Sequence, residues 1–149
     1  MMRELGSIIT FENEVLTIDN SNVQNKKITE EYAGKLRASY YFMGSLIGKY
    51  HEAEIAYPGG CVIGSRPINY HIESFKKMGI NVKNVADHYI MKTDELKGNE
   101  FYFDFPSVGA TINIMLAAIL AKGKTIIYNA AKEPEIANVA SFLNSMGAK

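Results

Sequence analysis

The chain has 149 residues, of which 47% are hydrophobic and 21% charged, and its 16 basic and 16 acidic side chains balance to a net charge of zero. This composition is typical of a compact domain and excludes the disordered, collagen-like and disulfide-rich classes. Because a zero net charge provides no strong basic field, we expect no nucleic-acid partner. One cysteine, no basic-then-apolar leader and no apolar run of membrane-spanning length predict a cytoplasmic protein without a membrane anchor.

The first residues predict the end of a helix at Gly6, followed by a β-hairpin with strands at 7–11 and 15–18. The same pattern recurs after Gly79, where a hairpin is expected at 80–85 and 89–92. Gly147 is a third glycine in the same setting, so the spacing of the three glycines is 73 and then 68 residues. A period near seventy residues indicates an internal repeat.

Between these glycines, helices and strands alternate in chain order. One helix is expected to bury a face made of Leu36, Tyr40, Met43, Ile47 and Tyr50, and a strand at 53–57 and a second helix should follow it. The second helix should bury Ile68, Ile72, Phe75 and Met78. After an extra strand at 101–105, the order returns with a helix at 108–122, a strand at 125–128 and a helix from Pro134 that buries Ile136, Val139, Leu143 and Met146.

This order predicts an α/β (α+β) fold of repeated helix-strand-helix-hairpin units, with helices packed against sheets. We expect a partial unit at 1–27, a complete unit at 28–98 and a second partial unit at 99–149. One domain of a longer repeat protein explains this division more economically than a self-contained fold, and uncovered apolar faces would then favour self-association.

The loop at 58–67 is the most informative candidate for chemistry. Cys61 follows two adjacent glycines at the end of a predicted strand, and Arg66 comes just before the next helix, where exposed amides favour anions. A lone cysteine is more often buried and inert, but a glycine-rich loop is a poor place to bury a side chain. Arg66 and the helix N-terminus could stabilise a thiolate, so a reactive Cys61 is the favoured interpretation.

Other candidates have ordinary structural alternatives. Ser107 and Gly109 open a helix after a strand, which indicates either an anion site or a simple helix cap. Arg37 lies beside small residues on the first long helix and is either a ligand contact or a solvated arginine. His71 is expected to be a structural histidine. The three histidines are far apart and have no partner at ligand spacing, so no metal site is predicted.

Five motifs together resemble one family, the UDP-N-acetylglucosamine 1-carboxyvinyltransferases, which are enolpyruvyl transferases of the EPSP synthase family. The resemblance covers essentially the whole chain and runs in order through these motifs: Pro58-Gly59-Gly60-Cys61, Gly64-Ser65-Arg66-Pro67, Leu36-Arg37-Ala38-Ser39, Ser107-Val108-Gly109-Ala110-Thr111 and Asn129-Ala130-Ala131-Lys132-Glu133-Pro134-Glu135. It implies an inside-out α/β barrel in each of two domains, with the chain forming part of the domain that carries the catalytic loop.

The resemblance also implies an activity and its residues. The substrates would be phosphoenolpyruvate and UDP-N-acetylglucosamine, with no cofactor, and fosfomycin would be a possible inhibitor at Cys61. The implied catalytic acid is Cys61. The implied substrate-binding residues are Arg37, Arg66, Pro67, Ile68, Asn69, Tyr70, Ser107, Val108 and Gly109.

Two departures limit what is expected of the chain alone. Some members have a lysine where this sequence has Phe105, which removes a charge contact to the diphosphate. The family's Lys-Asn pair, its proposed aspartate base and a further phosphate-binding arginine belong to stretches outside this chain, so the isolated piece is expected to be inactive. A non-catalytic sugar-nucleotide-binding or interaction module and a shikimate-type sister transferase remain as alternatives.

Overall fold

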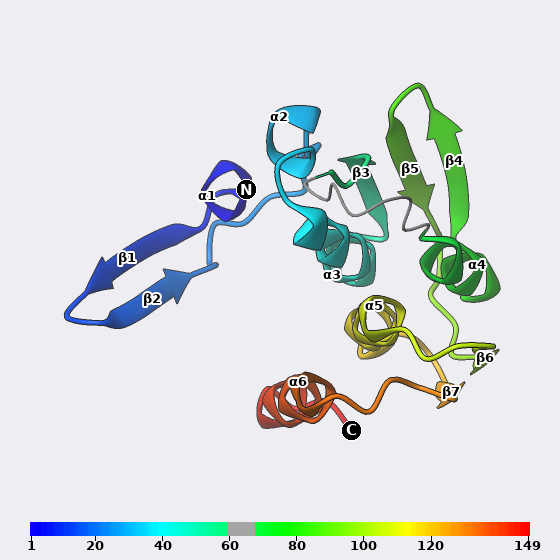
Figure 1. Cartoon of the computed structure of the whole chain (residues 1–149). Helices are drawn as coiled ribbons and strands as arrows, with labels where there is room; N and C mark the ends of the chain where they lie inside the picture. The colour runs from blue at the N-terminus through cyan, green and yellow to red at the C-terminus, as the bar shows by residue number, and fades with distance from the viewer. Residues whose placement is uncertain (60–67) are drawn as a thin grey trace.

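The computed structural model describes residues 1–59 and 68–149, and Figure 1 shows its helices and strands. The fold is mixed α/β, as the sequence predicts. In chain order the elements are α1 (Met2–Leu5), β1 (Ile8–Glu12), β2 (Val15–Asp19), α2 (Glu30–Ala33), the 3₁₀ helix η1 (Arg37–Tyr40), α3 (Tyr41–Tyr50), β3 (Glu52–Ala56), α4 (Asn69–Lys77), β4 (Asn81–Val85), β5 (His88–Lys92), β6 (Glu100–Tyr102), α5 (Val108–Ala118), β7 (Ile126–Tyr128) and α6 (Pro134–Ser145).

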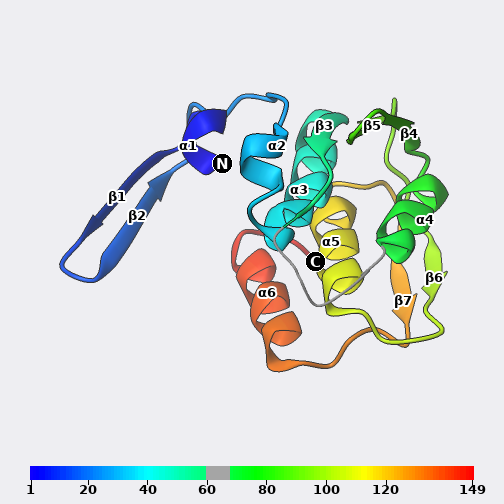
Figure 2. The ribbon, with the colours of Figure 1, turned by 45° about the horizontal axis from the view of Figure 1, so that its top comes forward.

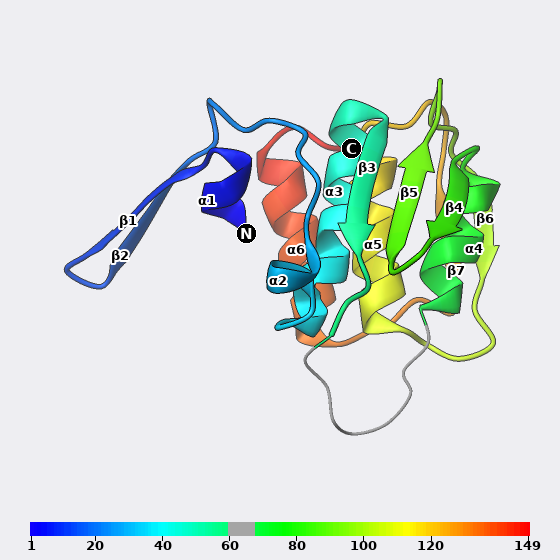
Figure 3. The same cartoon turned by 90° about the horizontal axis from the view of Figure 1, so that it is seen from above.

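The first hairpin stands apart from the rest of the chain. Helix α1 ends at Gly6, whose φ of +107° is the left-handed conformation that glycine adopts without strain. Strands β1 and β2 then pair antiparallel around Asn13 and Glu14, which both have positive φ and form the turn. Figure 3 shows this hairpin projecting away from the helices and the larger sheet.

The larger sheet has the strand order β3–β5–β4, with both pairings antiparallel. Ile28 extends it on the other side of β3 through a parallel bridge to Ile55. Helices α3 and α4 pack beside this sheet, and the side chains of Ile55, Phe75 and Met91 are fully buried between the layers. The predicted burial of Phe75 on α4 is therefore confirmed, and the hairpin β4–β5 completes the core.

Helices α3 and α5 approach each other unusually closely. A Cβ added to Gly44 would lie 2.3 Å from the Asn113 carbonyl oxygen, and one added to Gly48 would lie 3.0 Å from the Leu116 carbonyl oxygen. Two glycines four residues apart lie on the same side of a helix, so they open one strip of α3 to the backbone of α5. The two helices form the centre of the molecule, as Figure 2 shows.

The last third of the chain begins with β6 and β7, which pair in parallel with α5 as their connection. Parallel strands need a crossover of this kind, and helix α6 then follows from Pro134, which occupies the first turn as expected. The glycines predicted to end helices, Gly79 and Gly147, both have positive φ, at +89° and +104°. The division of the chain into repeated units stays a prediction.

Three details of the predicted helices are wrong. Leu36 precedes η1 and is 49% exposed, because the chain enters the helix there in an extended conformation. Helix α5 ends at Ala118 instead of residue 122, since Lys122 turns away to donate its backbone N–H to the Leu96 carbonyl oxygen. Met146 is 69% exposed because no described strand covers that end of α6.

Candidate substrate-binding site

Several helices begin at one end of the molecule. Helices α4 and α5 both start there, close to where β3 ends, as Figure 3 shows. The N-terminus of a helix presents unpaired amides and a partial positive charge, which favour bound anions. The predicted substrate-binding residues in the described part of the chain belong to these helix starts, so sequence positions 37, 68–70 and 107–109 meet in one region.

Arg37 and Gly109 come together through Tyr40. The Arg37 guanidinium carbon lies 5.8 Å from the centre of the Tyr40 ring, within the range of a cation–π contact. A Cβ added to Gly109 would lie 2.7 Å from the Tyr40 hydroxyl, so a larger residue there would require the Tyr40 side chain to shift. The structure therefore joins two predicted residues that are 72 positions apart through Tyr40, which the sequence marks only as part of a buried helix face.

Asn113 is a buried residue of α5 that links this region to neighbouring helices. Its side chain is fully buried, and its Oδ1 accepts a hydrogen bond of 2.7 Å from the Gly44 backbone N–H. Its Nδ2 donates to the Tyr40 carbonyl oxygen and also lies 2.9 Å from His71 Nδ1. One amide thus ties α5 to η1, α3 and α4, and buried polar groups that are satisfied in this way fix one arrangement of the elements.

His71 is held in its neutral form. Because Asn113 Nδ2 is a donor, His71 Nδ1 must accept and cannot carry a proton. Burial lowers the pKa of His71 to about 4, and the nearby Arg37 charge adds to the shift. The Tyr40 ring packs edge-on against the imidazole, with 4.8 Å between the ring centres. The prediction of a structural histidine is confirmed by these contacts.

The remaining predicted residues have clear structural settings. Ile68 is buried at the start of α4, while Asn69 is exposed and Tyr70 is half-buried against Phe103, with 5.0 Å between the ring centres. Ser107 caps α5, because its Oγ accepts a hydrogen bond of 3.3 Å from the backbone N–H of Ala110. Val108 follows it as the first residue of the helix.

Cys61, Arg66 and Pro67 lie outside the described residues, so their predicted roles stay predictions. Tyr40 and Asn113 are the two residues of the region that sequence reasoning missed. Asn113 had a signal, since it interrupts an otherwise apolar run on α5. Tyr40 had none, because its position on the apolar face of a helix is equally typical of an ordinary core residue.

Within residues 1–59 and 68–149, no cluster of three or more His, Cys, Asp or Glu side chains could hold a metal ion. In the same two ranges, no helix is long and apolar enough to cross a membrane. Helix N-termini and the Arg37 guanidinium lie together on the described surface, and both kinds of group favour bound anions.

Two solved enolpyruvyl transferases have the same fold as this chain. The enolpyruvyl transferase NikO from Streptomyces tendae superposes with a TM-score of 0.82 at 17% identity, and the match covers 99% of this chain and 35% of that one. EPSP synthase from Acinetobacter baumannii superposes with a TM-score of 0.75 at 15% identity, over 99% of this chain and 34% of that one. At such identities the likeness establishes the fold alone.

The comparisons of sequence are more specific than those of structure. The profile of the family EPSP synthase (3-phosphoshikimate 1-carboxyvinyltransferase) matches residues 1–149, and the chain belongs to this family. It is 48% identical over 148 residues to UDP-N-acetylglucosamine 1-carboxyvinyltransferase 2 of Listeria monocytogenes serotype 4b (strain F2365), and 48% identical over 149 residues to the Bacillus subtilis (strain 168) protein of the same name. The chain spans 35% of the length of each of these relatives.

Proposed function

We propose that the chain forms part of the catalytic-loop domain of a cytoplasmic enolpyruvyl transferase. The enzyme would transfer the enolpyruvyl group of phosphoenolpyruvate to the 3-hydroxyl of UDP-N-acetylglucosamine and release phosphate, as the first committed step of peptidoglycan synthesis. The observation that carries the proposal is the meeting of Arg37, residues 68–70 and residues 107–109 at one end of the fold. The 48% identity to proteins named for this reaction supports the choice of substrates.

In the proposed reaction, Cys61 donates a proton to the methylene carbon of phosphoenolpyruvate. The oxygen of the sugar 3-hydroxyl then forms a bond to the adjacent carbon as the hydroxyl loses its proton. Departure of phosphate with loss of a proton from the new methyl group restores the carbon–carbon double bond. A general acid is needed for the first step because the adjacent carbon becomes electron-poor only once the methylene carbon takes up a proton.

The described residues would bind and orient the sugar nucleotide. The N-termini of α4 and α5 provide amides and partial positive charge for the diphosphate. Arg37 supplies a full positive charge, and its contact with Tyr40 holds it beside the start of α5. Arg66 is proposed to hold the phosphate of phosphoenolpyruvate. Phe105 is 74% exposed and offers no charge, so the diphosphate would depend more strongly on Arg37 and the helix ends than in relatives with a lysine there.

The test uses a chimera in which these 149 residues replace the matching segment of the Bacillus subtilis relative. We expect phosphate release that requires both phosphoenolpyruvate and UDP-N-acetylglucosamine. Cys61→Ala should abolish release, whereas Cys61→Asp should retain part of it because a carboxylic acid also donates a proton. A chimera that folds, as shown by a cooperative thermal transition, but releases no phosphate would contradict the proposal. Full activity of Cys61→Ala would contradict the role of the cysteine.

A further inference from the structure

Asn129 follows β7 directly and has a φ of +55°, which lies in the left-handed region. Asparagine adopts this conformation more readily than most residues with a Cβ, and glycine adopts it without strain. The Asn129 side chain is also engaged, because its Nδ2 donates a hydrogen bond of 2.9 Å to the Phe103 carbonyl oxygen. The same Nδ2 lies 3.5 Å from the Asp104 carbonyl oxygen. Asn129 therefore connects the end of β7 to the turn that follows β6.

Phe103 is held by both of its backbone polar groups. Its N–H donates to the Tyr128 carbonyl oxygen at 3.4 Å, and its own carbonyl oxygen accepts from Asn129. The Phe103 side chain is buried and packs against Tyr70, with 5.0 Å between the ring centres. Tyr70 lies in the first turn of α4. The backbone position of Phe103 therefore sets where one ring of the predicted binding segment 68–70 is supported.

The turn held by Asn129 also leads into the start of α5. Only three residues lie between Phe103 and Ser107, the residue that caps this helix. The Ser107 Oγ accepts from the Ala110 N–H at 3.3 Å, and the Ser107 carbonyl oxygen accepts from the Thr111 N–H at 2.9 Å. Because so short a segment has few conformations once its first residue is fixed, the hydrogen bond from Asn129 restricts where α5 begins.

A second hydrogen bond joins the same segment to α5 itself. The Ala131 N–H donates to Thr111 Oγ1 at 3.2 Å. Thr111 and Ala131 are 1% and 4% exposed, so this bond is shielded from water and costly to leave unmade. Two residues of one short segment thus hold the turn before α5 and the first turn of α5, and the start of the helix is fixed from both sides.

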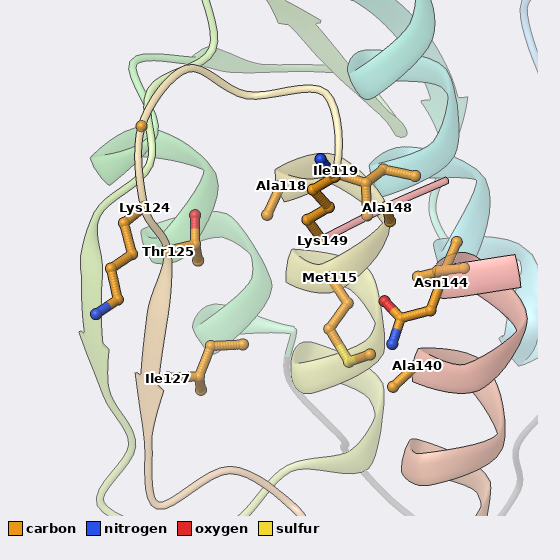
Figure 4. Close-up of a pocket in the computed structure, with 12 residues that line it drawn as sticks. Met115, Ala118, Ile119, Lys124, Thr125, Ile127, Ala140, Asn144, Ala148 and Lys149 are labelled. Carbon is orange, nitrogen blue, oxygen red and sulfur yellow. The ribbon is translucent and has the colours of Figure 1, made fainter. Parts of the chain in front are cut away.

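These two bonds act at only one end of α5. Farther along the helix, α5 and β7 lie on opposite sides of an apolar groove of about 400 Å³ that α6 also lines. Figure 4 shows Met115 of α5, Ile127 of β7 and Ala140 of α6 around this groove. None of the described binding residues lines it. In the described part of the chain, residues 129–131 therefore provide the connection between β7 and the start of α5.

We propose that Asn129 is a positioning residue for the sugar-nucleotide surface. By holding Phe103, Asn129 sets both the Tyr70 ring on α4 and the backbone amides at the start of α5. The two helix starts thereby keep the spacing that a single diphosphate-linked ligand needs. Asn129 does not touch the ligand, so loss of its side-chain bond loosens the surface without removing any group that binds. This inference rests on the proposed function, because that function names the ligand.

The test measures phosphate release by the chimera with the Bacillus subtilis relative. Asn129→Gly removes the side-chain donor and keeps the left-handed backbone without strain. We expect the KM for UDP-N-acetylglucosamine to rise about tenfold while kcat and the KM for phosphoenolpyruvate change less than about twofold, because only binding is weakened. Asn129→Asp keeps the size of the side chain but loses the N–H donor, so it should raise that KM at least as much. The matched control is Asn13→Gly, since Asn13 has a φ of +49° in the first hairpin, and it should change none of these constants.

Amide hydrogen exchange in the ligand-free 149-residue chain separates this inference from the proposed function, because it requires no activity. Asn129→Gly should speed exchange of the Ala110 and Thr111 amides about tenfold and leave that of Ile47 in α3 unchanged. A chimera that releases no phosphate contradicts the proposed function, and the exchange result then decides the role of Asn129. The inference is overturned by unchanged exchange at Ala110 and Thr111, by an unchanged KM for UDP-N-acetylglucosamine in an active chimera, or by a fall in kcat as large as the rise in KM.

Discussion

The middle segment (residues 28–98) and the last segment (residues 99–149) follow the same order of helix, strand and helix, yet their burial differs. Met78 and Met146 each follow the second helix of their segment by one residue, and Met78 is fully buried whereas Met146 is 69% exposed. The helices are alike in pattern, so the difference comes from the hairpin β4–β5, which covers only the middle segment. In this fold the hairpin completes the core that the helical pattern begins.

The largest expected effect on stability comes from breaking the polar link between the two segments. Asn113→Leu keeps the volume of the side chain but leaves the Gly44 N–H and the Tyr40 carbonyl oxygen buried without this partner. Since each unsatisfied buried group costs roughly 1–3 kcal/mol, we expect the free energy of unfolding in urea to fall by about 4 kcal/mol.

The matched control is Asn138→Leu, because Asn138 is exposed on α6. Its effect should stay within about 0.5 kcal/mol, as is usual for surface substitutions. A loss below about 1 kcal/mol for Asn113→Leu would show that the two segments are joined by apolar packing alone.

A second substitution pair compares the two hairpins directly. Met91→Ala removes a fully buried side chain and should lower the free energy of unfolding by about 3 kcal/mol. Ile18→Ala, at the corresponding position of the first hairpin, should cost less than about 1 kcal/mol at low protein concentration, because Ile18 is 41% exposed. Equal costs in chemical denaturation would mean that the first hairpin is already covered in the single chain.

The smallest of the three principal effects is the dependence of stability on pH. The pKa of His71 is lowered from 6.5 to about 4 by burial, so below pH 6.5 the unfolded chain binds a proton that the folded chain does not. The contribution of His71 is therefore complete above about pH 6.5 and is lost as the pH falls toward 4. Between pH 7.5 and pH 5 we expect this residue to lower the free energy of unfolding by about 2 kcal/mol.

His71→Gln should remove that part of the pH dependence, because glutamine offers an acceptor to Asn113 but does not titrate in this range. The pKa itself can be read from the imidazole signals by NMR. A value near 6.5 for His71 would contradict the buried, neutral imidazole and its bond to Asn113.

Much of the fold could be predicted from the sequence because its signals are local. Gly6, Gly79 and Gly147 mark helix ends through a backbone conformation that favours glycine, and the hairpins follow from the strands and turns beside them. The predicted burial of Leu36 and Met146 is wrong because periodicity reports which residues share a face but not whether another element covers that face. Whether a helix face is covered depends on contacts between residues that are far apart in the sequence.

The candidate site, like the fold, has some features that the sequence predicts and others that only the folded structure shows. Arg37 and the segments 68–70 and 107–109 could be selected by resemblance to known motifs, but nothing local shows that they meet. Their meeting depends on Tyr40 at the start of α3 and on the close approach of Gly109, which are features of packing between η1 and α5. Asn113 could be suspected only as a polar residue in an apolar run, and its three partners follow from the folded arrangement.

The most direct test of the proposed sugar-nucleotide surface is to titrate the 149-residue chain with UDP-N-acetylglucosamine and follow its backbone amide signals by NMR. We expect the largest shifts to fall together on Arg37, residues 68–70 and residues 107–109. Arg37→Ala should reduce these shifts at equal ligand concentration. Shifts confined to the groove between α5 and α6, or an absence of shifts at saturating ligand, would contradict the assignment of this end of the fold as the sugar-nucleotide surface.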